Sequence, residues 1–171
     1  MTVEQAETIR VVITDASVLI NLTHTGHIPL LSCTPGYRFL VSEEVVEEIT
    51  DPWQRDLVDR AISDGTIERT KVEAPAELAV YAELTLILGS GESACLALAS
   101  CRGWYLACDE RRVFLREVRA RIGEYRLLNT PGLYVHWIRS GLLTVAEADE
   151  AKLKLESQRF KMTFGSFGES V

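Results

Sequence analysis

The fold class is decided by residues 10–22, which read Arg10-Val11-Val12-Ile13-Thr14-Asp15-Ala16-Ser17-Val18-Leu19-Ile20-Asn21-Leu22. The apolar run over residues 10–14 predicts a buried strand, and the pattern from residue 16 to about residue 24 predicts a helix. Asp15 stands where the strand passes into the helix, the position at which α/β sheets bind ligands. An Asp at such a position also serves as a helix cap, so Asp15 alone has two interpretations.

Strands and helices alternate along the rest of the chain. We expect further strands near residues 37–41, 66–72, 104–108 and 125–128, and helices near 27–32, after Ser42, and over 52–64, 75–88, 92–101, 110–122, 131–140 and 144–158. This order predicts an α/β fold with a mainly parallel central sheet flanked by helices in three α/β/α layers. We expect a single domain over residues 1–171, with a core at about 9–140 and a C-terminal helix and tail at 141–171.

Composition narrows the class of protein. The chain has 171 residues, of which 47% are hydrophobic, so it can bury a core without disulfides or structural metal. Its acidic start lacks the basic and apolar blocks of a signal peptide, and no apolar stretch has the length of a membrane span. We therefore expect a cytoplasmic protein with no membrane segment.

The cysteines lack the C-x-x-C spacing of zinc sites, which predicts free, mostly buried thiols at Cys33, Cys95, Cys101 and Cys108.

The net charge of −7 argues against general attraction to nucleic acid, because phosphate contacts normally come with a basic surface. Positive charge is nevertheless concentrated in one segment, residues 110–126, which holds six arginines against three glutamates. The expected helix in this segment is the best candidate for phosphate contacts, although a solvated helical face explains it as well. The candidate residues are Arg111, Arg112, Arg116 and Arg119.

Three further carboxylates accompany Asp15, namely Glu48, Glu92 and Asp109. The carboxyl ends of parallel strands meet at one edge of a sheet, so Asp15, Asp109 and Thr130 should be neighbours. Each acid alone has an ordinary explanation: a cap for Asp109, a helix-dipole partner for Glu92 and a solvated acidic face for Glu48. Together the four suggest a site for divalent metal.

The chemistry of such a site follows from its donors. Magnesium prefers oxygen ligands, and the lack of a His/Cys constellation disfavours zinc. Four close carboxylates cannot all stay ionised without cations, and a bound ion could activate water to hydrolyse a phosphodiester. Ser17, Asn21 and Thr130 could hydrogen-bond the acids or a metal-bound water, or could be simple helix-end residues.

These motifs resemble the PIN-domain family of metal-dependent nucleases, which includes the VapC-type toxins of prokaryotic toxin–antitoxin pairs. Asp15-Ala16-Ser17 and the apolar run after it resemble the family's D-x-[ST] opening. The family's V-x-x-E-[IL] helix is matched by Val45-Val46-Glu47-Glu48-Ile49, and this match makes Glu48 rather than Glu47 the candidate acid. The G-E-x-x-x-[ILV]-x-L-A helix is matched from Gly91-Glu92-Ser93 to Ala99, and the last common acid by Leu106-Ala107-Cys108-Asp109. The resemblance covers about residues 9–140.

The segments Asn129-Thr130-Pro131-Gly132-Leu133 and Ser140-Gly141-Leu142-Leu143, with the final helix, are similar to a longer VapC-like subgroup. Two positions depart from the pattern. Only Glu110 can supply the further acid that many members carry after the strand-end Asp, and Asn129 stands where the subgroup has Gly.

The resemblance implies an endoribonuclease that cleaves RNA, with Asp15, Glu48, Glu92 and Asp109 holding one or two Mg²⁺ or Mn²⁺ ions. It also implies a small antitoxin partner and a homodimer. A second hypothesis is a PIN-fold module that binds RNA or protein without cutting. A phosphatase or receiver domain fits less well, because the haloacid-dehalogenase type would have a second Asp where Ser17 stands.

Overall fold

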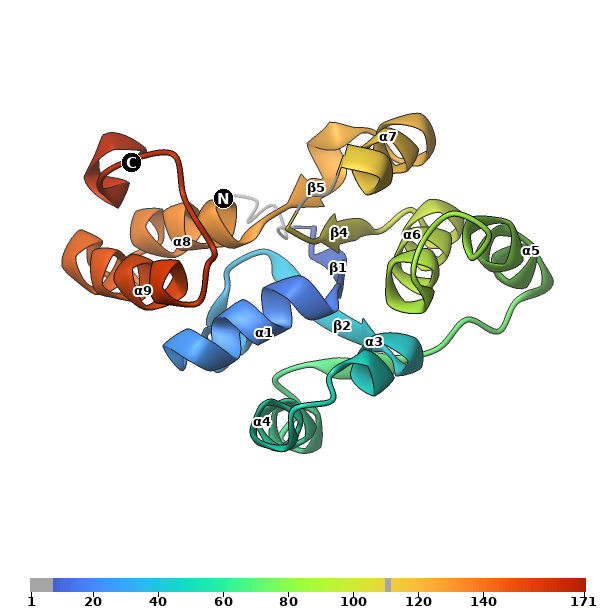
Figure 1. Cartoon of the computed structure of the whole chain (residues 1–171), viewed down its shortest axis with the longest axis horizontal. Coiled ribbons are helices and arrows are strands. Elements are labelled where there is room, and N and C mark those ends of the chain that lie inside the picture. Colours follow the sequence, from blue (N-terminus) through green and yellow to red (C-terminus); the bar gives the residue numbers. More distant parts are fainter. Residues whose placement is uncertain (1–7, 110–111) are drawn as a thin grey trace, which may run out of the picture.

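The computed structural model describes residues 8–109 and 112–171, and its centre is a parallel sheet with helices on both faces (Figure 1). In the described residues the sheet has five strands in the order β3-β2-β1-β4-β5, and every neighbouring pair is parallel. The strands are β1 (Arg10–Thr14), β2 (Tyr37–Ser42), β3 (Glu68–Thr70), β4 (Tyr105–Ala107) and β5 (Leu127–Leu128). The predicted α/β class and parallel sheet are confirmed.

Helices cover the sheet in two outer layers. One layer holds α1, α8 and α9, and the other holds α5, α6 and α7 (Figure 1). The helices are α1 (Ala16–Thr25), α2 (Leu30–Cys33), α3 (Glu43–Glu48), α4 (Pro52–Ser63), α5 (Pro75–Leu84), α6 (Ser90–Arg102), α7 (Arg112–Arg121), α8 (Thr130–Arg139) and α9 (Val145–Ser157). None of the helices in the described part of the chain is long and apolar enough to cross a membrane.

β1 is the central strand, which explains its continuous apolar sequence. It pairs with β2 from Arg10 opposite Tyr37, and with β4 from Val12 opposite Tyr105. Helices lie on both faces of the strand, and Val12 and Ile13 are fully buried on opposite sides of it. The chain then enters α1 at Asp15, whose side chain accepts a hydrogen bond from the backbone N–H of Ser17.

Several boundaries differ from the sequence prediction: α5 ends at Leu84 rather than at residue 88, and β3 is shortened to Glu68–Thr70. Two further differences have a clear physical cause. Residues 124–126 form a 3₁₀ turn after Gly123, which has φ +77°, so the strand predicted from residue 125 shrinks to Leu127–Leu128. α6 begins at Ser90 rather than at residue 92, because Glu92 accepts a hydrogen bond from the backbone N–H of Gly89 and closes a capping box. The Gly-Ser-Gly segment therefore belongs partly to the helix.

The cysteine prediction is half right. Cys95 and Cys108 are buried free thiols, whereas Cys33 and Cys101 are exposed.

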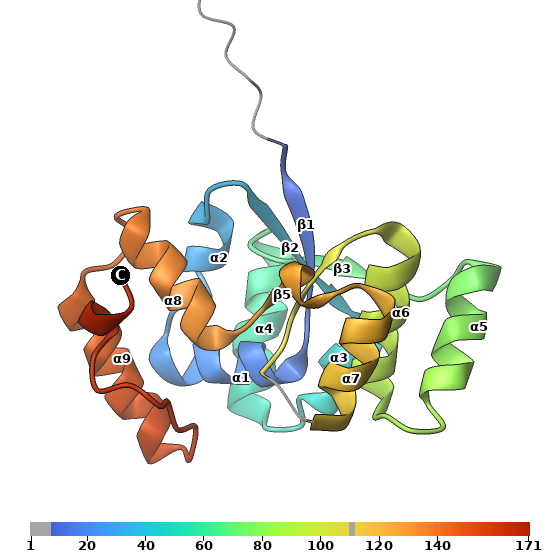
Figure 2. The same cartoon turned by 90° about the horizontal axis from the view of Figure 1, so that it is seen from above.

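The C-terminal tail lies back on the body of the protein. After α9 it runs alongside that helix (Figure 2), and Phe167 is fully buried. Asp149 of α9 accepts hydrogen bonds from the Ser166 hydroxyl at 2.6 Å and from the Phe167 backbone N–H at 2.8 Å. α9 in turn packs against α1, so the tail is held next to the helix that follows Asp15.

A partly buried ion pair joins α5 to α6. Arg102 donates from Nε to Oε1 of Glu77 at 2.6 Å and from Nη2 to Oε2 at 3.0 Å, a bidentate arrangement. This guanidinium, assisted by the backbone N–H groups of Glu73 and Ala74, lowers the pKa of Glu77 to about 2. A shift of that size corresponds to roughly 2–3 kcal/mol after allowance for solvent screening at the partly exposed Arg102. The pair thereby fixes the helix that carries Glu92.

Candidate functional site

The four predicted acids line one cavity of about 330 Å³ at the carboxyl edge of the sheet. Asp15 follows β1 and Asp109 follows β4, while Glu48 ends α3 and Glu92 lies in the first turn of α6. Two acids thus come from strand ends, and the other two come from helices that meet across the cavity. The fold brings together carboxylates that are up to 94 positions apart in the sequence (109 − 15).

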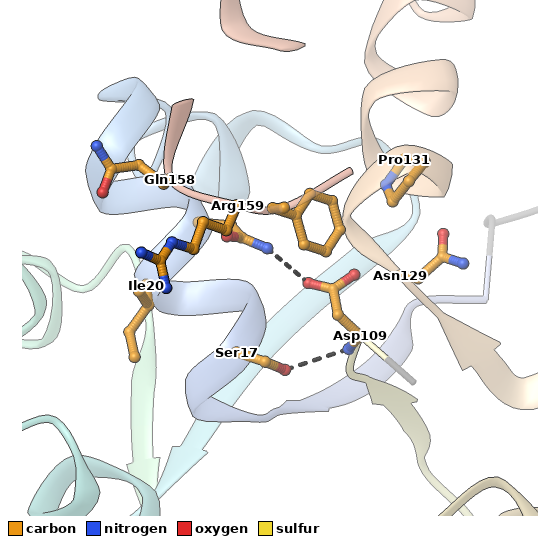
Figure 3. Close-up of a pocket in the computed structure, with 9 residues that line it drawn as sticks. Ser17, Ile20, Asp109, Asn129, Pro131, Gln158 and Arg159 are labelled. Atoms are coloured by element: carbon orange, nitrogen blue, oxygen red, sulfur yellow. Dashed lines mark hydrogen bonds between the residues drawn. The ribbon is translucent and has the colours of Figure 1, made fainter. Parts of the chain in front are cut away.

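Ser17 connects Asp15 to Asp109. The Oδ2 atom of Asp15 accepts hydrogen bonds from the Ser17 backbone N–H at 3.2 Å and from its hydroxyl at 2.6 Å. The same hydroxyl oxygen accepts the backbone N–H of Asp109 at 3.1 Å (Figure 3). Asp15 therefore does cap α1, but the described residues place no hydrogen bond on its Oδ1 atom. Capping by one oxygen leaves the other available to a cation.

Asp109 is held by the two polar residues predicted to support it. Asn21 donates to Oδ2 at 2.8 Å, and Thr130 donates to both oxygens, from its hydroxyl to Oδ2 at 2.6 Å and from its backbone N–H to Oδ1 at 2.9 Å. Burial raises the pKa of Asp109, and the charge of Asp15 raises it further, against the lowering by these hydrogen bonds. A cation next to the pair would counteract that rise, because it favours the charged form of the carboxylate.

Glu48 and Glu92 face each other across α3 and α6. Glu48 is exposed, as expected for a residue on a solvated helix face. Its Oε1 atom nevertheless accepts a hydrogen bond from the backbone N–H of Gly91 at 2.6 Å. A Cβ on Gly91 would lie only 2.4 Å from Oε2 of Glu48. Glycine is therefore required at residue 91 if the carboxylate of α3 is to approach α6 this closely. Glu92 combines its capping role with a place in the cavity lining.

Glu44 is a further acid near the site, and it was not among the candidates selected from the sequence. It stands one turn before Glu48 on α3, and its Oε2 atom is buried without a hydrogen bond among the described residues. The thiol of Cys95 lies close to both glutamates: burial raises its pKa most, and the charges of Asp15, Glu48 and Glu44 contribute. The i, i+4 spacing puts Glu44 and Glu48 on the same face of α3, but it does not tell which way that face points.

The ligand atoms that these acids offer are of the kind that a hard divalent cation prefers. All four acids offer carboxylate oxygens, and the unpartnered oxygen of Glu44 and the charge of Asp15 beside Asp109 add negative charge at this edge of the sheet. Within residues 8–109 and 112–171, however, no three His, Cys, Asp or Glu side chains are arranged closely enough to hold an ion. The carboxylates would therefore have to move toward one another as an ion binds.

The arginines of α7 are largely engaged with acids. Arg116 pairs with Glu117 at 3.2 Å, and Arg119 pairs with Glu124 at 2.7 Å. Arg112 is exposed, whereas Arg111 lies outside the described residues, as does the candidate acid Glu110. Exposed ion pairs of this kind are weak, so they could exchange for phosphate. Phosphate binding by α7 stays a prediction.

A comparison with protein-family models identifies the region that carries this site. A model described as a PIN domain matches residues 11–123, which is more than half of the chain. The chain belongs to the PIN-domain family. PIN domains have a nuclease-type fold and are generally nucleases, which typically use divalent metals. The matched region contains all four acids of the cavity, and it stops before α8 and α9. A search of curated proteins found no match.

Proposed function

We propose that this PIN-domain protein is a metal-dependent endoribonuclease that hydrolyses RNA phosphodiester bonds. The observation that carries the proposal is the meeting of Asp15, Glu48, Glu92 and Asp109 in one cavity at the carboxyl edge of the sheet. Their oxygen-only donor set suits one or two Mg²⁺ or Mn²⁺ ions. When bound, such an ion supplies an activated water and stabilises the departing oxygen.

The residues around the acids would keep this site in order. Ser17 holds Asp15 and the backbone of Asp109 at a fixed separation. Asn21 and Thr130 hydrogen-bond both oxygens of Asp109, and these bonds would fix the orientation of its carboxylate toward an ion. Glu48 and Glu92 would complete the ligand set from the opposite wall as the acids close on the ion.

We further propose that the protein acts in the cytoplasm as a VapC-like toxin, with a small antitoxin as its partner and a homodimer as its working form. The motifs at Asn129–Leu133 and the final helix support the subgroup assignment. We also propose that residues 1–171 form a single PIN-like domain, which the packing of α9 on α1 supports. A small antitoxin gene directly upstream would support the toxin role, and an isolated gene would count against it.

Cleavage of structured and single-stranded RNAs by the purified protein tests the enzymatic proposal. We expect cutting with Mg²⁺ or Mn²⁺, none with chelator, and a loss of at least about 100-fold in Asp15→Asn and Asp109→Asn. Asp56→Asn is the matched control, because Asp56 is an exposed acid of α4 whose carboxylate pairs with Arg60. Cleavage that survives both site substitutions would show that the acids are not the active site.

The same experiment separates the enzyme from a binding module. Tight RNA binding by the wild-type protein without cutting, in either metal, would support the PIN-fold binding module instead.

A further inference from the structure

Arg159 adopts a backbone conformation that normally selects glycine. It follows α9 with φ +67°, and in residues 8–109 and 112–171 no other residue except glycine has a positive φ. Its N–H bonds the carbonyl of Glu156 at 3.0 Å, and the N–H of Phe160 bonds that of Leu155 at 3.0 Å. These two bonds form a Schellman motif with Arg159 at the left-handed position. Residues with a side chain are disfavoured in this conformation. We therefore expect the side chain of Arg159 to have a function that explains why glycine does not stand there.

The side chain lies in a cavity that adjoins the acid-lined one. This second cavity has a volume of about 450 Å³, and its lining includes Asp109, Arg159 and Phe160. Figure 3 shows Arg159 across the cavity from Asp109. Ser17, Ile20 and Asp109 line both cavities. A chain bound across the acids can therefore continue directly past Arg159.

The guanidinium of Arg159 is available to an external anion. Arg159 is exposed, and within the described residues it forms no ion pair, in contrast to Arg116 and Arg119 of α7. The carboxylate of Asp109 in the same cavity is hydrogen-bonded by Asn21 and Thr130, and among the described residues it forms no ion pair with Arg159. Phe160, next in the chain, is half-buried and packs against the core, which holds its ring at the cavity wall.

We propose that Arg159 and Phe160 form a subsite for single-stranded RNA beside the scissile bond. Arg159 binds the phosphate next to the one that is cut, and Phe160 supports the adjoining base. Guanidinium groups bind phosphate with paired hydrogen bonds, and aromatic rings beside a cationic residue stack on unpaired bases. The subsite comes from the segment after α9, outside the region that the family model matches. The proposal rests on the proposed ribonuclease function, because it needs RNA at the acids.

The test measures RNA affinity in an Asp15→Asn background, which prevents cutting. Fluorescence anisotropy with labelled single-stranded RNA, in Mg²⁺ over a series of salt concentrations, gives both the Kd and its salt dependence. We expect Arg159→Gln to weaken binding about five- to tenfold and to lower the slope of log Kd against log salt by about one. Phe160→Leu should weaken binding without a change of slope, since it removes stacking and no charge.

Arg69→Gln is the matched control, because Arg69 is an exposed arginine on the edge strand β3 that lines neither cavity. Its loss should change the affinity by less than about twofold. An equal loss in both variants would show that only general charge attraction is involved, and would overturn the proposal.

Arg159→Gly separates binding from a structural role. Glycine suits the left-handed position, so this variant should melt at the same or a higher temperature while losing as much RNA affinity as Arg159→Gln. A lower melting temperature with unchanged affinity would show that the arginine serves only the fold.

The two proposals fail in distinguishable ways. If the parent protein binds RNA and Arg159→Gln binds it equally well with the same salt slope, the subsite is wrong and the ribonuclease proposal stands. If the wild-type protein neither binds nor cuts RNA, both proposals are wrong.

Discussion

Adding a single methyl group at Gly91 should damage activity while leaving the fold intact. In Gly91→Ala the new Cβ would lie 2.4 Å from Oε2 and 2.8 Å from Cδ of Glu48, whereas ordinary contacts begin at 3.4 Å. The Glu48 carboxylate must therefore retreat by about 1 Å, and it loses its hydrogen bond from residue 91. A displacement of about 1 Å at a catalytic group can cost on the order of 100-fold in rate.

The stability change should be small because its two terms oppose each other. Alanine in place of glycine within a helix stabilises by roughly 0.5–1 kcal/mol, and the lost hydrogen bond costs a similar amount where water can replace the partner. Glu48 is an exposed residue, so water can reach its carboxylate. For a protein of this size we expect the melting temperature to stay within about 4 °C of the wild type.

The assay is metal-dependent RNA cleavage, measured beside thermal unfolding followed by circular dichroism. Gly89→Ala is the matched control: its Cβ would lie 3.7 Å from the nearest Glu48 oxygen, an ordinary contact. Alanine is a poorer N-cap than glycine, so this control should lose some stability and keep its activity. If Gly91→Ala cleaves RNA at the wild-type rate, the reasoning is refuted, because the position of Glu48 would then not matter for activity.

Three further outcomes follow from contacts elsewhere in the protein. Thr130→Val removes the 2.6 Å hydroxyl bond to Asp109, and cleavage assays should show a loss of about tenfold or more; an unchanged rate would contradict the positioning role. Glu77→Gln should cost roughly 2–3 kcal/mol at pH 7 in urea unfolding, because Arg102 loses its carboxylate partner. The folded-state pKa of Glu77 is depressed, so the wild type's advantage is complete above about pH 4.5 and should shrink as the pH falls toward 2; a constant difference would be inconsistent with this. A thiol reagent should label two of the four cysteines quickly in the folded protein, Cys33 and Cys101, and the other two only after unfolding; rapid labelling of all four would contradict the burial of Cys95 and Cys108.

Local sequence patterns were sufficient for most of the fold. The apolar run before Asp15 predicted the central strand. The helix predicted over residues 144–158 is α9, and it begins with the two reciprocal hydrogen bonds of a capping box between Thr144 and Glu147. These features depend on residues close in the chain. The strand at residues 125–128 was predicted too long, because a turn after Gly123 cannot be distinguished by periodicity from the end of a strand.

The sequence predicted that the four acids would lie together, as they do in one cavity, but it did not predict their geometry. The order of strands and helices already implied that Asp15, Asp109 and Thr130 would be neighbours, and hydrogen bonds now join Thr130 to Asp109. The face chosen by Glu44 could not be derived, because it depends on how α3 packs against α6. The placement of Arg159 depends in the same way on the packing of α9 against α1.

The sequence by itself determined the alternation of strands and helices, the four acids and the polar residues near them, because each depends on local patterns of side chains. Only the tertiary structure decided that Gly91 must lack a side chain, that one oxygen of Asp15 caps α1 while the other stays available, and that a tail arginine borders the acid-lined cavity. The physical reason is that close packing joins atoms from distant segments within a few ångströms, and sequence spacing carries no record of that proximity.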